Sequence, residues 1–143
     1  MKTVLIFYSY SGNTRQLASK AAEKMKADIV EIKDVKKPKG LKVMFGGCFD
    51  SIKGKQWPIE EINVDLTQYD RIMLMGPIWA RNFTPQINSV INRLPKNKEV
   101  GLIAVSGGSG ANFDKAVKKI EGRNCKVVKT KDILMKDVKN KKQ

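Results

Sequence analysis

The feature that most constrains the fold of this chain is an alternation between two hydrophobic periods. Short runs of apolar and β-branched residues alternate with segments in which apolar residues recur every three or four positions. This alternation predicts an α/β fold in which a parallel sheet carries helices on both faces. The first run, Thr3–Tyr8, is continuously apolar or β-branched, which indicates a central strand buried on both sides.

The pattern predicts five strands and four helices in one domain. We expect the strands at Thr3–Tyr8, Ile29–Ile32, Arg71–Met75, Glu99–Ser106 and Cys125–Met135. We expect the helices at Asn13–Lys26, at Leu41–Ile52 despite Gly46-Gly47, from Thr84-Pro85 to Pro95, and from Phe113 to Gly122. A domain over residues 1–135 is therefore followed by a lysine-rich tail, residues 136–143, too short and basic for a reliable terminal helix. One face of the sheet is expected to be thinly covered near this end.

Charge and composition narrow the function classes. The chain has 28 lysines and arginines against 14 acidic residues, a net charge of +14, with lysines gathered in Lys33–Lys55 and Lys126–Lys142. Such a surface serves either solubility or an acidic partner. Because the chain has no histidine and only Cys48 and Cys125, a zinc cluster or Cys-His nucleophile is not expected, and we expect two reduced thiols. No apolar run approaches the length of a membrane helix, so we expect a cytoplasmic protein without a transmembrane segment.

Three strand-to-helix joins carry the candidate chemistry, because ligands of open parallel sheets bind beyond the carboxyl ends of the strands. The first join is Ser9-Tyr10-Ser11-Gly12-Asn13-Thr14, whose hydroxyls, carboxamide and helix-start amides suit a phosphate, although it also fits an ordinary turn rich in capping residues. The second runs from Gly76 to Thr84 and carries Trp79, which either caps the core or stacks on a flat ligand. The third, Ser106–Asn112, is glycine-rich and can approach a ligand with bare amides.

Two common nucleotide-binding patterns are not supported. Gly108-Ser109-Gly110 is followed by Phe113 where a dinucleotide fingerprint has its third glycine, so a nicotinamide site in this loop is not expected. The chain also has no Gly-x4-Gly-Lys-Ser/Thr sequence, which argues against a P-loop enzyme.

Taken together in this order, the three joins resemble the FMN-binding loops of the flavodoxin family, most closely its short prokaryotic members. The resemblance implies a flavodoxin-like three-layer sandwich with a five-stranded parallel sheet in the order 2-1-3-4-5 and a terminal helix that is absent or curtailed. It implies that Ser9–Thr14 hold the FMN phosphate and that two further loops hold the flavin ring. The implied cofactor-binding residues are Ser9, Tyr10, Ser11, Gly12, Asn13, Thr14, Pro77, Ile78, Trp79, Ala80, Arg81, Asn82, Ser106, Gly107, Gly108, Ser109 and Gly110.

The resemblance implies an electron carrier that shuttles single electrons between redox partner proteins. The positive charge of this chain favours an acidic docking surface on such a partner. Two alternatives stay open: an FMN-dependent NAD(P)H or quinone oxidoreductase, and a basic module that binds nucleic acid or an anionic membrane surface. The chain departs from well-known flavodoxins in its basic charge and in a second ring loop without aromatic or acidic residues. Arg15 is expected to point to solvent, whereas Arg81, on a loop, is the better candidate for a contact with FMN.

Overall fold

The computed structural model of the 143-residue chain describes residues 1–37, 39–40, 42–108 and 110–135. The expected lysine-rich tail, residues 136–143, lies outside this range, as does Ser109 of the third join. No helix in the described part of the chain is both long and apolar enough to cross a membrane.

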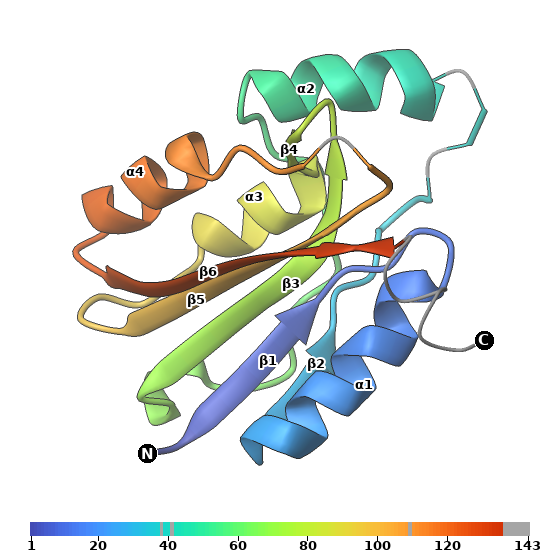
Figure 1. The fold of residues 1–143 in the computed structure, drawn as a ribbon. Helices are drawn as coiled ribbons and strands as arrows, with labels where there is room; N and C mark the ends of the chain where they lie inside the picture. The colour runs from blue at the N-terminus through green and yellow to red at the C-terminus, as the bar shows by residue number, and fades with distance from the viewer. Residues whose placement is uncertain (38, 41, 109, 136–143) are drawn as a thin grey trace.

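A five-stranded parallel sheet in the order β2-β1-β3-β5-β6 forms the centre of the molecule, and a short strand, β4, pairs antiparallel with the end of β3 (Figure 1). The strands are β1 (Thr3–Phe7), β2 (Asp28–Glu31), β3 (Arg71–Trp79), β4 (Asn82–Phe83), β5 (Glu99–Ser106) and β6 (Lys126–Leu134). The predicted flavodoxin-like fold class is confirmed, and the predicted order 2-1-3-4-5 is found once β4 is set aside.

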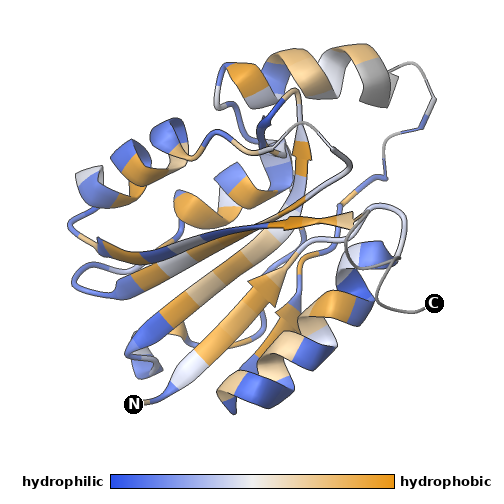
Figure 2. Ribbon diagram, viewed as in Figure 1, coloured by the Kyte–Doolittle hydropathy of each residue, from blue (hydrophilic) through white to orange (hydrophobic). Residues whose placement is uncertain are grey.

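Helices cover both faces of the sheet. They are α1 (Asn13–Met25), α2 (Cys48–Ile52), α3 (Pro85–Ile91) and α4 (Asp114–Gly122), with a π-helical segment, η1 (Lys42–Gly47), leading into α2 and a short 3₁₀ turn, η2 (Leu66–Gln68). Figure 1 shows α1 on one face and α3 and α4 on the other. Figure 2 shows how the apolar residues concentrate in the strands between these layers.

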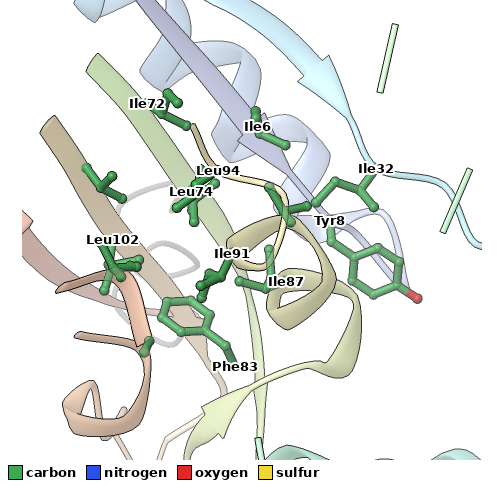
Figure 3. Close-up of a cluster of buried hydrophobic side chains, with 14 of the residues drawn as sticks. Ile6, Tyr8, Ile32, Ile72, Leu74, Phe83, Ile87, Ile91, Leu94 and Leu102 are labelled. Carbon is green, nitrogen blue, oxygen red and sulfur yellow. The ribbon is translucent and has the colours of Figure 1, made fainter. Parts of the chain in front are cut away.

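The larger core lies between the sheet and α3 and α4. Alternate residues of the central strands, among them Ile6 and Leu74, meet Ile87 and Ile91 of α3 there (Figure 3). The other face buries Leu5, Phe7, Met73 and Met75 with Ala18 and Ala22 of α1. Both faces of β1 are therefore buried, as its continuous apolar run predicts.

The third strand is longer than predicted. It was expected to end at Met75, but β3 continues to Trp79 because Gly76 and Pro77 still pair with Ala104 and Val105 of β5. Beyond them, Ile78 and Trp79 pair with β4. Part of the join that was predicted as a loop is thus a β-hairpin, which holds its side chains more rigidly than a loop would.

The helix after this hairpin begins as predicted but ends earlier. Thr84 is its N-cap residue and Pro85 its first residue, yet the buried Thr84 hydroxyl makes no hydrogen bond within the described part of the chain. The helix ends at Ile91 rather than at Pro95.

The predicted helix at Leu41–Ile52 is present from Lys42 onward as η1 and α2, and Leu41 lies outside the described residues. The large apolar side chains described in this segment do not form a core face. Phe45, Phe49 and Ile52 are exposed, while the small residues Gly47 and Ser51 face the protein. The three-and-four spacing identified the helix correctly and does not say which side is buried.

The thin cover expected near the end of the sheet is seen at β6. Most residues of this edge strand are exposed, including Lys126, Lys129 and Lys131. Lysines on an edge strand oppose pairing with a strand of another molecule. Of the two thiols, both free, Cys125 is buried and Cys48 is half-buried.

Candidate functional site

The first join is a tight turn between β1 and α1. The backbone N–H of Gly12 donates a hydrogen bond of 3.0 Å to Oγ of Ser9. Gly12 has a φ of 97°, a left-handed conformation that glycine adopts without strain. Ser11 and Asn13 are exposed, whereas Thr14 is buried at the start of the helix. The turn therefore presents its hydroxyl and amide groups around the amino end of α1.

This end of α1 suits an anion. Its N-cap residue is Gly12, which has no side chain to satisfy the first backbone amides, and its first turn contains no acidic residue. Unsatisfied amides and the helix dipole create a positive potential at that point. A phosphate is the group that such an end binds best.

Two cations lie beside the turn. Arg15 does not simply point to solvent, because its Nε lies 2.5 Å from Oε1 of Glu31 at the end of β2. Lys37, which sequence reasoning did not single out, donates a hydrogen bond of 2.9 Å to the Tyr10 carbonyl and lies 4.9 Å from the centroid of the Tyr10 ring. The charge of Arg15 is offset by Glu31, so Lys37 is the cation that adds positive charge beside the first join.

The second join is the β3–β4 hairpin. Its two turn residues, Ala80 and Arg81, have φ values of 53° and 68°, left-handed conformations that are uncommon outside glycine. The Asn82 side chain donates to the Ala80 carbonyl at 2.9 Å and so stabilises the turn. Pro77 and Ile78 lie in the strand and are half-buried, while Ala80 and Arg81 are exposed. The favoured two-residue turn of a β-hairpin requires a positive φ at both central residues, which accounts for these conformations.

Trp79 lies in a cluster of three aromatic rings. Its ring meets Tyr10 of the first join edge-on at 6.0 Å between centroids, and it meets Trp57 at 5.9 Å. The indole also lies under α2, close to Gly47, where an added Cβ would be 2.6 Å from Trp79 Cε3. Trp57 is fixed in turn by a 2.7 Å hydrogen bond from its Nε1 to Asp50. Sequence reasoning found Trp79 but missed Trp57 and Gly47 as its neighbours.

The third join is organised by Asp132 of β6. Its carboxylate accepts a hydrogen bond of 2.9 Å from the buried Ser106 hydroxyl and one of 2.8 Å from the backbone N–H of Ala111. Gly107 and Gly108 are exposed between these anchors, and Gly110 has a φ of 80°. The Ser106 hydroxyl is thus directed at Asp132. The one sequence signal for Asp132 was an isolated acid among the lysines of the last strand.

Contacts between the joins bring them together. The first and second meet through Tyr10 and Trp79, and the second and third meet where the Asn112 N–H donates to the Arg81 carbonyl at 2.7 Å. These contacts place an uncapped helix end, an aromatic ring and a glycine-rich backbone at one edge of the sheet. This donor set fits a flat, phosphorylated cofactor such as FMN, and it defines the chain as a flavodoxin-like α/β protein.

The family is shown by comparison with known proteins. Residues 1–135 match the family described as NADPH-dependent FMN reductase, and the chain belongs to that family. The family supports FMN as the cofactor, as the sequence predicted. It also corrects the resemblance in one respect, because the fold is flavodoxin-like but membership of the flavodoxin family itself is not confirmed. No curated protein matches the sequence at a significant level.

Solved structures show the same fold at low identity. A flavoprotein from Lactobacillus acidophilus NCFM, solved in complex with FMN, is 21% identical with a TM-score of 0.72, and the match covers 99% of both chains. A protein from Bacteroides uniformis ATCC 8492, provisionally described as a flavoprotein, is 22% identical with a TM-score of 0.79 over 97% of this chain and 96% of that one. Megasphaera elsdenii flavodoxin is 20% identical with a TM-score of 0.53, covering 92% and 85%.

Proposed function

We propose that this protein binds FMN non-covalently across the three joins and carries single electrons between redox partner proteins. The amino end of α1 supports this most directly. Its N-cap residue, Gly12, has no capping side chain, and Tyr10 of the aromatic cluster lies two residues before Gly12 in the chain. One feature binds a phosphate and the other a flat ring. FMN, when bound, supplies the redox chemistry, and the protein supplies position and electrostatics.

The residues of the site have distinct roles in this proposal. Ser9, Ser11, Asn13 and Thr14 donate hydrogen bonds to the phosphate together with the first amides of α1. Trp79 contacts the ring, and the backbone of Ala80–Asn82 and of Gly107–Gly110 lies along the polar edge of the ring. Asp132 positions the third join by holding Ser106 and Ala111, and it does not contact the cofactor.

The family match favours a second function at least as strongly, that of an NAD(P)H-dependent FMN reductase. The two functions differ in whether a nicotinamide cofactor is a substrate. We expect no sustained oxidation of NADPH or NADH by the FMN-loaded protein when a quinone or free FMN is the acceptor. The measurement is the loss of absorbance of the reduced nicotinamide under steady-state conditions. Turnover at about 1 s⁻¹ or faster, within the usual range of enzymes, would establish the reductase instead.

The FMN site itself is tested by the visible absorbance of the purified protein before and after FMN is added and the excess removed. We expect the wild type to retain a flavin spectrum and the double variant Thr14→Ala, Trp79→Ala to lose it. One substitution removes a hydroxyl at the phosphate turn and the other removes the ring contact. Losses of roughly 1–3 kcal/mol at each position together lower the affinity about thirtyfold or more.

The matched control is the double variant Thr67→Ala, Trp57→Phe. The first substitution removes a hydroxyl far from the site, and the second keeps an aromatic ring beside Trp79. This control should retain most of the bound flavin. If the wild type binds no FMN, or if the Thr14 and Trp79 variant binds it as well as the wild type does, the three joins are not the cofactor site.

A further inference from the structure

A groove beside the first join is lined mainly by residues to which the proposed function assigns no role. It has a volume of about 880 Å³ and lies between the segment after β2 and the helical segment η1–α2. Its lining residues are Asp34, Val35, Lys36, Lys37, Lys39, Gly46, Asp50, Trp57 and Pro58. One wall therefore carries three lysines, another is formed by a helix, and Trp57 and Pro58 add apolar surface.

The helix that forms one wall also exposes an apolar ridge. Phe45, Phe49 and Ile52 are 59%, 62% and 43% exposed. They follow one another at helical spacing, and Phe45 and Phe49 are chain neighbours of the groove residues Gly46 and Asp50. Exposed aromatic side chains gathered on one helix are unusual on a surface that meets only water, and they mark an interaction site.

The groove carries more positive than negative charge, because three lysines and two aspartates, Asp34 and Asp50, line it. Within the described part of the chain, no acidic side chain forms an ion pair with Lys36, Lys37 or Lys39. The two aspartates of the groove already accept hydrogen bonds from neutral groups. Asp50 accepts from Trp57 Nε1 at 2.7 Å, and Asp34 accepts from the Tyr8 hydroxyl at 2.7 Å and the Gln86 amide at 2.8 Å.

The Asp34 carboxylate is held firmly in this network. Burial and the neighbouring carboxylate raise the pKa of Tyr8 far above its ordinary value, so the phenol remains a donor at every physiological pH. Gln86 is itself buried and donates to both the Tyr8 hydroxyl and Asp34. The segment that carries the three lysines is thereby anchored to the core at its first residue.

We propose that this groove and the adjoining ridge of Phe45, Phe49 and Ile52 form the docking surface for an acidic, amphipathic segment of a redox partner protein. Acidic side chains of the partner pair with Lys36, Lys37 and Lys39, and its apolar side chains cover the ridge. This inference rests on the proposed function, since the surface stands next to the predicted ring site. Gly47 of the same helix lies against Trp79.

Charge and composition favour this occupant over others. A second copy of the chain would bring together two proteins of +14 net charge. The last eight residues, 136–143, carry four lysines against one aspartate and have Val138 as their only aliphatic residue, so they would repel the lysines of the groove and leave the ridge uncovered. A nucleic acid would satisfy the lysines, but its phosphodiester backbone offers nothing apolar to cover the isoleucine and two phenylalanines.

The test uses the full FMN-loaded chain and a fluorescent peptide of about 16 residues in which leucines recur at helical spacing among glutamates. Binding is measured by fluorescence anisotropy. Two double variants are compared: Lys36→Glu with Lys39→Glu, and Phe45→Ser with Phe49→Ser. We expect each to weaken peptide binding about tenfold or more, because central aromatic and charged contacts dominate such interfaces. Hydrogen exchange should show protection of residues 34–52 when the peptide is bound.

The matched control is Lys20→Glu, Lys118→Glu, which makes the same change in net charge on the exposed sides of α1 and α4. It should change the affinity by less than about threefold. Equal weakening by the control and the groove variants would overturn the proposal, as would absence of binding by the wild type. A dimer of the wild type in sedimentation that the phenylalanine variants dissociate would also overturn it. The same holds if the groove variants lose binding to oligo(dT) or anionic vesicles but still bind the peptide.

FMN retention is measured on every variant. A wild type that binds the peptide but not FMN would contradict the proposed function and leave the docking surface supported. A wild type that retains FMN but does not bind the peptide would contradict the docking surface alone.

Discussion

Replacing Gly47 with alanine is expected to destabilise the protein by about 1–3 kcal/mol and to lower its affinity for FMN about tenfold. The new Cβ would lie 2.6 Å and 2.7 Å from Cε3 and Cζ3 of Trp79, closer than such atoms approach in folded proteins. The indole cannot move freely, because it also packs against Tyr10 and Trp57. Either α2 lifts from the hairpin or Trp79 turns away from the predicted ring site.

Urea unfolding measures the stability, and quenching of FMN fluorescence measures the affinity. The control is Gly122→Ala at the end of α4, where an added Cβ meets no atom within 4 Å and the backbone is not left-handed. This control should leave both quantities within about 1 kcal/mol of the wild type. If Gly47→Ala changes neither quantity, the packing of α2 on Trp79 does not hold the site.

Removing the carboxylate of Asp132 is the second change for which we expect a large effect. Asp132→Ala leaves the buried Ser106 hydroxyl and the Ala111 N–H without the two oxygens that accept from them at 2.9 Å and 2.8 Å. Hydrogen bonds to a charged group contribute about 1.5–3 kcal/mol each, and buried donors without partners add a penalty. We expect a loss of about 2–4 kcal/mol in stability and at least tenfold weaker FMN binding, because Gly107–Gly110 lose their anchors.

The comparison variant is Glu121→Ala, which removes the same charge from the exposed face of α4. Thermal unfolding and FMN titration are measured for both variants and for Asp132→Asn, whose side chain retains one oxygen to accept a hydrogen bond. The asparagine variant should fall between the wild type and Asp132→Ala. Equal effects of Asp132→Ala and Glu121→Ala would show that net charge alone, and not the position of the third join, is responsible.

The strands and the first join were predictable because they depend on local physics. An apolar run such as Thr3–Tyr8 is stable only as a buried strand, and a turn of small polar residues before a helix exposes amides that bind anions. The structure places the first strand and the first helix within one residue of their predicted bounds, with β1 at Thr3–Phe7 and α1 at Asn13–Met25. The cofactor followed from the order of the three joins, and the family match supports it.

The second and third joins were only partly predictable. Gly76 and Pro77 usually indicate a loop, yet in the fold they remain in β3 because β5 lies beside them. The sequence distance between Ser106 and Asp132 is 26 residues, so their hydrogen bond depends on β6 pairing in register with β5. The periodicity of apolar residues within either segment does not show which residues of β5 and β6 lie side by side.

By itself, the sequence determined the alternation of strands and helices, the parallel sheet and the turn of small polar residues between β1 and α1, since each depends on residues within a few positions of one another. Only the tertiary structure decided which face of α2 is buried, which rings surround Trp79, and which carboxylate holds the glycine-rich join. Gly47 is buried against Trp79, where an added Cβ would lie 2.6 Å from the ring, and Ser51 is buried as well, whereas Phe45 and Phe49 are exposed. Such choices depend on contacts between segments far apart in the chain, and periodicity does not encode them.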